Sequence, residues 1–229
     1  MNRTHMTRHE LKETDEITSK IKSLTAAVYA RKTEVITGAA VLLVIVLGII
    51  GWNLYSANRN ANAQSQLAQA IHIFNDPAIK SDKERFERTL AEAQKTRDAY
   101  GSLQAGTIAL YYIAVCQDGL GDTAKATESF QQVIASGDAS IAGVAKFALA
   151  GTYRKHGDAQ KATDIYKQLY ETGGYSKSAA VLELAKLSES SNKMDEAKTY
   201  YQKIVSEFPD SPFRQEADVA LKRLGVPAA

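Results

Sequence analysis

Cysteine and proline are scarce in this chain, which has one cysteine and four prolines among 229 residues. The single cysteine, Cys116, excludes an internal disulfide, a CxxC redox pair and a zinc site built from cysteines, and we expect it to be buried. With 14 glycines as well, the composition excludes a collagen-like repeat and a low-complexity disordered chain. An excess of basic charge is also lacking, because 28 lysines and arginines face 26 acidic residues. This near balance argues against a nucleic-acid-binding protein, which normally needs a clustered basic surface.

Motifs that carry chemistry are missing too. His9-Glu10 begins a zinc-protease motif, but the fifth position holds Glu13 instead of histidine. No P-loop, dinucleotide-binding or nucleophile-elbow motif occurs. The chain has three other histidines, and none of them has the neighbours that a metal site needs. They are His5, His72 and His156. We therefore predict no catalytic residue, no cofactor and no metal, and we expect that the protein is not an enzyme.

The longest uncharged stretch runs from Val35 to Tyr55, and no charged residue occurs between Glu34 and Arg59. About 20 apolar residues span the hydrocarbon core of a bilayer as a helix. A buried helix of a soluble protein is the alternative, but such a helix rarely lacks a polar stripe over this length. Aromatic residues flank the stretch, as interfacial anchors do: Tyr29, Trp52 and Tyr55. The sequence therefore predicts one transmembrane helix at residues 35–55.

The flanking cations predict which way this helix points. Four precede it closely, whereas Arg59 alone follows it over a comparable distance; the four are Lys20, Lys22, Arg31 and Lys32. The positive-inside rule then places residues 1–34 in the cytoplasm and the chain beyond residue 56 across the membrane. A cleavable signal peptide is the alternative, because an A-x-A sequence follows at residues 61–63, but its apolar core and its leader would be shorter. We predict an uncleaved signal anchor.

The leader before this helix carries apolar residues at three- and four-residue spacing, with charged residues on the remaining faces. The pattern is typical of a short amphipathic helix that docks in a groove or lies along the bilayer surface. A solvated, frayed leader explains it equally well, and Met6 is an alternative start. The apolar positions are Leu11, Thr14, Ile17, Ile21, Leu24 and Val28.

Beyond the apolar stretch, one pattern occurs three times. Gly121-Asp122 is followed by Ala126 and Phe130, Gly157-Asp158 by Ala162 and Tyr166, and Asn192-Lys193 by Ala197 and Tyr201. The alanines are 36 and then 35 residues apart. The tetratricopeptide repeat (TPR) is a 34-residue helix-turn-helix with small residues, an aromatic residue and a closing proline at these spacings. Leu149-Ala150, Leu184-Ala185 and Pro209 also match it. We predict an all-α fold, in which the transmembrane helix is followed by a right-handed α-solenoid of TPR hairpins.

Each repeated residue has a physical reason. Small residues let the two helices of a unit approach closely, and the aromatic residue fills the space between one unit and the next. Glycine supplies the positive φ of the turn and aspartate caps the following helix. The small residues predicted at these contacts are Ala114, Ala150 and Ala185 on the first helices and Ala126, Ala162 and Ala197 on the second.

The ends of the array depart from the consensus, as the ends of a solenoid do. A degenerate first hairpin is predicted at residues 59–76 and 83–99, and its first helix carries Leu67, Ala70, Ile71 and Phe74 on one face. A final capping helix is predicted to open at Asp210-Ser211-Pro212 and to end near Gly225 and Pro227. The expected organisation is a leader at 1–34, the anchor at 35–55, a linker and degenerate hairpin at 56–106, three TPR units at 107–209, and the cap and tail at 210–229.

Partners are expected on the concave surface that the first helices of such units line. By register with the key alanines, the candidate partner-binding residues are Tyr111, Val115, Asp118, Phe147, Arg154, Lys155, Leu182, Lys186 and Glu189. This mixture of aromatic, apolar and oppositely charged side chains suits a segment of another protein. The paired lysines and asparagines that grip the C termini of chaperones are missing at the matching positions, so docking of a free C-terminal carboxylate is not supported.

A leader containing His9-Glu10-Leu11-Lys12, one membrane helix and about three TPR units together resemble the YfgM-like family, ancillary subunits of the bacterial SecYEG translocon. The resemblance covers the whole chain in architecture. It implies a single-pass protein of the bacterial inner membrane, with a cytoplasmic N terminus and a periplasmic repeat domain. That domain would contact translocon subunits, periplasmic chaperones or newly exported clients. An accessory or assembly subunit of another inner-membrane complex, respiratory or photosynthetic, is the alternative.

Overall fold

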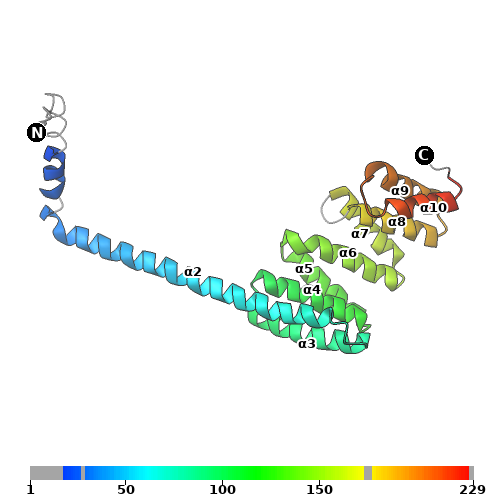
Figure 1. Cartoon of the computed structure of the whole chain (residues 1–229), viewed down its shortest axis with the longest axis horizontal. Coiled ribbons are helices and arrows are strands. Elements are labelled where there is room, and N and C mark those ends of the chain that lie inside the picture. The colour runs from blue at the N-terminus through cyan, green and yellow to red at the C-terminus, as the bar shows by residue number, and fades with distance from the viewer. Residues whose placement is uncertain (1–17, 27–28, 173–176, 227–229) are drawn as a thin grey trace, which may run out of the picture. The chain divides into compact units, whose positions relative to one another are not determined.

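The computed structural model describes residues 18–26, 29–172 and 177–226, and within these ranges the only regular elements are helices. Residues Leu11, Thr14, Ile17 and Val28 of the leader, together with His5, His9 and Pro227, fall outside the described ranges. The chain divides into two compact units, residues 1–58 and 59–229. Figure 1 labels the main helices, which are α2 (Lys32–Phe74), α3 (Asp82–Tyr100), α4 (Gln104–Gly119), α5 (Thr123–Ala135), α6 (Ala139–Lys155), α7 (Ala159–Thr172), α8 (Lys177–Ser190), α9 (Met194–Glu207) and α10 (Arg214–Arg223).

The first unit contains helical residues 18–26 and the N-terminal part of α2. Among the described residues, α2 is the one helix long and apolar enough to cross a membrane. None of its most apolar stretch is buried, and side chains such as Leu42 (64% exposed) and Val44 (69%) face outward. An apolar stretch with no buried residue is not part of the core of this chain, so the structure offers no support for a buried soluble helix at these positions.

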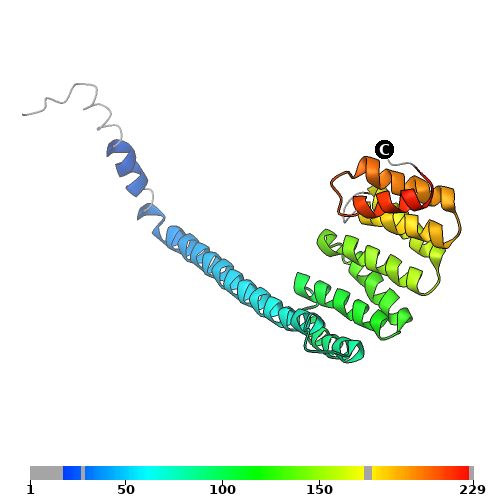
Figure 2. The same cartoon turned by 45° about the vertical axis from the view of Figure 1, so that its right-hand side comes forward.

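The second unit is a stack of helical hairpins, so the predicted all-α solenoid is confirmed. Pairs α4–α5, α6–α7 and α8–α9 follow one another, and α10 lies beyond the last pair (Figure 2). The six alanines predicted at the helix contacts are all 0% exposed. The predicted aromatic residues are buried as well, with Phe130 and Tyr166 at 1% and Tyr201 at 2%. Alanine on both helices brings the backbones close, and the buried ring fills the space that remains.

The turns within the hairpins follow from glycine and aspartate, as predicted. Gly121 has φ +86° and Gly157 has φ +87°, values that glycine adopts without steric cost. Asp122 Oδ1 then accepts a hydrogen bond from the Lys125 N–H (3.3 Å), and Asp158 Oδ1 accepts one from the Lys161 N–H (3.2 Å). These bonds satisfy backbone donors in the first turns of α5 and α7. The third hairpin uses Asn192 instead, a non-glycine residue at φ 59°.

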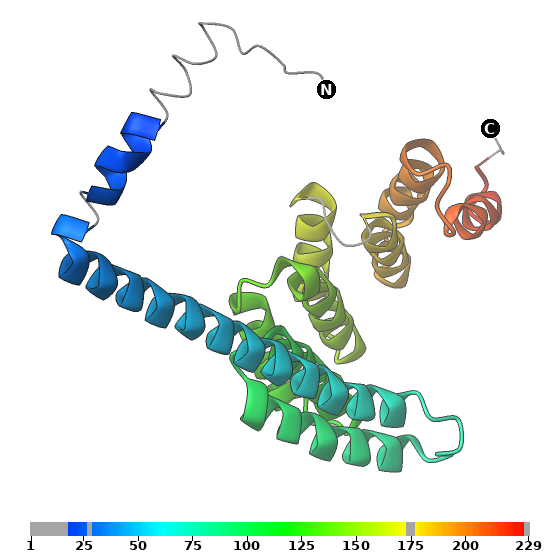
Figure 3. The same cartoon turned by 60° about the vertical axis from the view of Figure 1, so that its left-hand side comes forward.

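A first hairpin precedes the three units. Figure 3 shows α3 running back alongside the last turns of α2. The buried residues of this hairpin are Ala63, Leu67 and Ala70 on α2 and Thr89, Ala93 and Thr96 on α3, and all except Leu67 are small. Phe74 continues this face and packs edge-on against Tyr112 of α4, with ring centroids 5.3 Å apart. The apolar face predicted from Leu67 to Phe74 thus covers the start of the array.

The capping helix starts later than its sequence suggests. We expected Ser211 and Pro212 to open it, but α10 begins at Arg214. The Ser211 hydroxyl accepts a hydrogen bond from the Phe213 N–H (3.2 Å), and the Ser211 carbonyl accepts one from the Arg214 N–H (3.1 Å). Serine therefore forms a separate tight turn before the helix, a common use of its side chain. Ala217, Ala220 and Leu221 of α10 are buried and cover the apolar end of the last pair.

Candidate protein-interaction surface

A groove of about 450 Å³ lies between the first helices of two successive units, α4 and α6. It is lined by Tyr111, Val115, Asp118, Phe130, Ala148, Gly151, Thr152, Arg154 and Lys155. Five of these belong to the nine candidate residues predicted from the sequence: Tyr111, Val115, Asp118, Arg154 and Lys155. We call this feature the α4–α6 groove.

One half of the α4–α6 groove is apolar. The Tyr111 ring packs against Phe130 of α5, with centroids 6.0 Å apart, and edge-on against Tyr112, at 5.5 Å. Opposite this aromatic wall, α6 presents Ala148 and Gly151. A Cβ atom added to Gly151 would meet nothing nearer than the Tyr166 hydroxyl, at 3.8 Å. The groove therefore has an aromatic wall and an open floor at a helix-interior glycine.

Sequence reasoning missed Gly151, although the signal was present. Gly151 directly follows the key alanine Ala150, as Val115 follows Ala114 and Lys186 follows Ala185. The same register that selected Val115 and Lys186 therefore also selects Gly151. We overlooked it because a glycine has no side chain to offer a partner. Its contribution here is the space it leaves.

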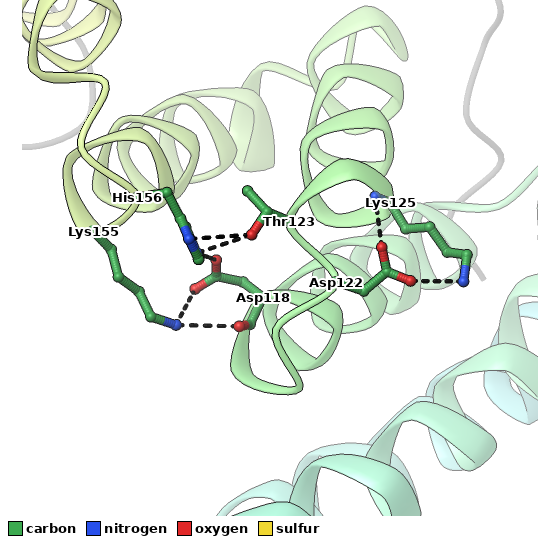
Figure 4. A network of polar contacts seen from close by, with 6 residues as sticks. All are labelled: Asp118, Asp122, Thr123, Lys125, Lys155 and His156. Carbon is green, nitrogen blue, oxygen red and sulfur yellow. Dashed lines mark hydrogen bonds and ion pairs between the residues drawn. The ribbon is translucent and has the colours of Figure 1, made fainter.

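The other half of the α4–α6 groove is charged, in the last turns of α4 and α6. Lys155 Nζ lies 3.1 Å from Asp118 Oδ2 and 3.1 Å from the Asp118 backbone oxygen (Figure 4). His156 joins the same carboxylate, with Nε2 3.1 Å from Asp118 Oδ1. Sequence analysis predicts no role for His156, whereas in the structure this residue connects two successive units.

Asp118, His156 and Thr123 resemble a hydrolytic triad in composition but not in geometry. In such a triad the histidine binds the nucleophile through one ring nitrogen and the carboxylate through the other. Here the same atom, His156 Nε2, lies 3.0 Å from Thr123 Oγ1 and 3.1 Å from Asp118 Oδ1 (Figure 4). Nδ1 also faces Thr123, at 3.3 Å, and has no contact with the carboxylate. The cluster therefore lacks the arrangement of a triad, and it joins the end of α4, the start of α5 and the end of α6.

Similar ion pairs join each first helix to the next. Arg154 Nε of α6 lies 3.2 Å from Glu183 Oε2 of α8, and Lys186 Nζ of α8 lies 2.9 Å from Glu216 Oε1 of α10. Arg223 of α10 pairs with Glu189 of α8 at 2.7 Å. Together with Asp118–Lys155, these pairs form a charged ladder along α4, α6, α8 and α10. All five charged residues predicted to bind partners therefore already bind a neighbouring unit or the capping helix.

The two signs of charge in the ladder differ in exposure. The side chains of Asp118, Glu183 and Glu189 are 19%, 17% and 18% exposed. Their cationic partners are far more open, with Arg154 at 49%, Lys155 at 53% and Arg223 at 61%. At these three pairs an approaching molecule therefore meets the cation before the carboxylate, whereas in the fourth pair Glu216 (49% exposed) is more open than Lys186 (41%).

The four remaining candidate residues lie outside the α4–α6 groove. Phe147 is half-buried and packs edge-on against Tyr166, with centroids 5.2 Å apart. Leu182 is only 3% exposed, because the cluster of α8, α9 and α10 encloses it. Contrary to the prediction, its side chain is therefore not available to a partner. Lys186 and Glu189 lie on α8 and take part in the charged ladder.

Buried ionisable groups near this surface stay neutral. Burial, assisted by the Glu183 carboxylate, raises the pKa of Tyr166 to about 12. Burial alone raises the pKa of the Cys116 thiol to about 12, and the side chain is 0% exposed, as expected for a packing cysteine. Neither group is an activated nucleophile. Among the described residues, no group of three or more His, Cys, Asp or Glu side chains could hold a metal ion.

Comparison with known proteins identifies the repeats. A family model described as "Tetratricopeptide repeat-like domain" matches residues 29–168, more than half of the chain, and a "Tetratricopeptide repeat" model matches residues 179–211. The chain belongs to the tetratricopeptide repeat-like family. No curated protein sequence matches it significantly.

Solved TPR structures share the fold. A kinesin light chain-like protein with nearly identical TPR-like repeats, from Podosopora anserina, has a TM-score of 0.56 at 16% identity, over 71% of this chain and 85% of the other. BtubC (BKLC) from P. vanneervenii has a TM-score of 0.51 at 13% identity, over 73% and 82%. At these identities the likeness concerns the fold alone. The tetratricopeptide repeats indicate a protein–protein interaction scaffold, a role in which this fold is typically not catalytic.

Proposed function

We propose that this protein is a membrane-anchored TPR scaffold of the bacterial inner membrane, whose repeat domain lies in the periplasm and binds proteins at the site of export. Its partners are translocon subunits together with periplasmic chaperones or newly exported clients. Within this proposal, residues 1–34 are the cytoplasmic leader, 35–55 the anchor, 56–106 the linker and first hairpin, 107–209 the three units and 210–229 the cap. The alternative is that the partner is another inner-membrane complex, and photo-crosslinking distinguishes the two.

The match of the TPR-like family to residues 29–168 carries this proposal. The matched region begins before the apolar stretch and continues through it into the repeats. An apolar helix included with the repeats favours a retained anchor over a signal peptide that is removed. The cations before the helix, including Arg31 and Lys32, favour a cytoplasmic N terminus. An anchor at the export site would raise the local concentration of the repeat surface, so that weak contacts with emerging chains become useful.

Cysteine labelling tests the topology. In a Cys116→Ala background, Ala135→Cys places a thiol at an exposed position of α5, and Ser23→Cys places one in the leader. A membrane-impermeant maleimide added to cells with opened outer membranes should label residue 135 and leave residue 23 unlabelled until the cells are lysed. The reverse pattern would invert the topology and remove the proposed role.

Photo-crosslinking tests the partners. A photoreactive residue at Val115, inside the α4–α6 groove, is compared with one at Ala135, which is exposed on α5 and outside the groove. The proposal expects translocon subunits, periplasmic chaperones or exported clients to be enriched at position 115 over position 135. Stoichiometric subunits of one other membrane complex, lost when residues 35–55 are replaced, would support the alternative partner. Equal, sparse crosslinks from both positions would argue against the groove as the binding surface.

A further inference from the structure

The α4–α6 groove combines an aromatic wall, open space at a glycine and two exposed cations, and together these features indicate what its ligand is. We propose that it binds an internal segment of a partner protein through one aromatic side chain, seated between Tyr111 and Gly151, and one carboxylate two residues further on, held by Arg154 and Lys155. This inference rests on the proposed function and names the chemistry that the scaffold recognises.

The apolar half of the groove favours an aromatic ligand. Tyr111 presents its ring beside Phe130, and Val115 and Ala148 complete apolar walls. Aromatic side chains gain extra stabilisation from edge-on or offset contacts with other rings, beyond the apolar area that they bury. An aromatic anchor can use Tyr111 in this way, whereas an aliphatic anchor of similar size cannot.

Gly151 provides an independent indication that something occupies the groove. Glycine is a poor residue for the interior of a helix, and a protein usually keeps one there only where close packing demands it. Gly119, the last residue of α4, shows such close packing, because an added Cβ would fall 2.6 Å from Phe86 Cδ2. At Gly151 the chain has room for a side chain, with no atom nearer than 3.8 Å. The space above Gly151 is therefore left for a ligand, and it lies on the floor of the groove.

The charged half favours an acidic ligand. Arg154 and Lys155 line the groove with Asp118, which pairs with Lys155, whereas the partner of Arg154, Glu183 of α8, is not part of the groove lining. The cationic side chains are 49% and 53% exposed, against 19% for Asp118 and 17% for Glu183, so the cations are the more accessible members of both pairs. Gly151 and Lys155 are four positions apart on α6, which is about 6 Å along the helix axis. An extended peptide covers this distance in about two residues, which sets the spacing of the aromatic and acidic side chains.

A peptide series on the unmodified protein tests this inference. The probe is the fluorescein-labelled peptide Gly-Ser-Ser-Phe-Ser-Asp-Ser-Gly, amidated at its C terminus and measured by fluorescence anisotropy with the full-length protein in detergent micelles. Replacing Phe by Ala should weaken binding about tenfold or more, since a buried aromatic anchor dominates such contacts. Replacing Asp by Lys should weaken binding about fivefold, and added salt should reduce the difference. Absence of binding, or equal affinity for all three peptides, would overturn the inference.

Paired variants locate the site. Gly151→Leu should fill the groove and weaken probe binding at least about tenfold, whereas Ala139→Leu, at an exposed position in the first turn of α6, should not change it. Lys155→Gln should remove most of the preference for Asp over Lys. Lys125→Gln is the matched control, because Lys125 also pairs with an aspartate, Asp122, but does not line the groove. Equal effects within either pair would place the peptide elsewhere.

The two levels of proposal fail separately. If peptides do not bind as described but partners still crosslink at Val115 in cells, the scaffold function stands and the ligand chemistry is wrong. If peptides bind as described but no export partner crosslinks in cells, the groove chemistry stands and the proposed partners are wrong.

Discussion

Lys155 of α6 reaches back to Asp118 of α4 and contacts both its side chain and its backbone oxygen, each at 3.1 Å. Asp118 lies in the last turn of α4, where helix carbonyls lack partners within the helix and attract cations. The contact therefore stabilises the end of one first helix with a charge from the next. Because Arg154–Glu183 and Lys186–Glu216 join later units across the same face, each unit contributes to the stability of its neighbour.

Asp118→Asn should lower the free energy of unfolding by about 1 kcal/mol, because it removes the charge that binds Lys155 and His156 across the unit boundary. Asp122→Asn is the matched control. Asparagine retains the acceptor that caps α5, and the lost ion pair with Lys125 is exposed and local, so a smaller change is expected. Urea unfolding followed by circular dichroism measures both. Equal losses would mean that the ladder contributes nothing beyond ordinary surface pairs.

The repeated core could be predicted from the sequence because its residues recur at fixed spacing. Ala126, Ala162 and Ala197, for example, are identified by periodicity alone, and each is 0% exposed. The Gly-Asp turns were equally predictable, since few residues adopt a positive φ or cap a helix well. The buried alanines and the turns depend on contacts within one unit or on positions that recur in each unit, so the sequence of the repeat is enough to predict them.

The charged ladder could not be predicted, because its partners lie about one repeat apart and vary from unit to unit. Asp118 pairs with Lys155 at one boundary, whereas Arg154 pairs with Glu183 at the next, with the signs reversed. Register placed Asp118, Arg154 and Lys155 on the right face, but it did not select Glu183 and could not show which residues contact each other. Leu182 illustrates the same limit, since its burial depends on α9 and α10 packing over α8.

Gly151→Ala and Gly157→Ala should have opposite effects on stability. An added Cβ meets nothing nearer than 3.8 Å at Gly151 and nothing within 4 Å at Gly157. Gly151 lies inside a helix, where alanine is favoured, and the substitution should stabilise the protein by about 1 kcal/mol. Gly157 has φ +87°, a conformation that costs alanine about 1 kcal/mol or more. Thermal unfolding of the two variants measures both effects. A shift of the melting temperature in the same direction for both variants would contradict this prediction.

Gly106→Ala should destabilise the protein by about 2 kcal/mol or more, because an added Cβ would collide with backbone. It would strike the Tyr100 carbonyl oxygen and fall 2.7 Å from Gly101 Cα, so only a shift of the α3–α4 turn could relieve the contact. The matched control is Gly151→Ala, which lies in an equivalent first helix and has room for the methyl group. Urea midpoints of the two variants should therefore move in opposite directions.

Alkaline pH should destabilise the folded chain through Cys116 and Tyr166. Burial raises the pKa of Cys116 from 9.0 to about 12 and that of Tyr166 from 10.0 to about 12. At a pH between the ordinary and the raised pKa of each group, the group is ionised in the unfolded chain but keeps its proton in the folded chain. A rise in pH through this range therefore favours unfolding. The loss of folding stability should begin near pH 9 and continue toward pH 12.

Cys116→Ala separates the thiol from the other groups that titrate at high pH. The variant should be less stable than the unmodified protein at pH 7, because alanine fills less of the buried site. Its stability should nevertheless fall less steeply between pH 9 and pH 10, since one of the groups that ionise on unfolding is gone. In the unmodified protein, the thiol should react with a maleimide slowly in buffer and rapidly in denaturant, because the side chain is fully buried. An unchanged pH slope together with rapid labelling in buffer would show that Cys116 is open to solvent, and the alkaline effect would then have to come from tyrosines alone.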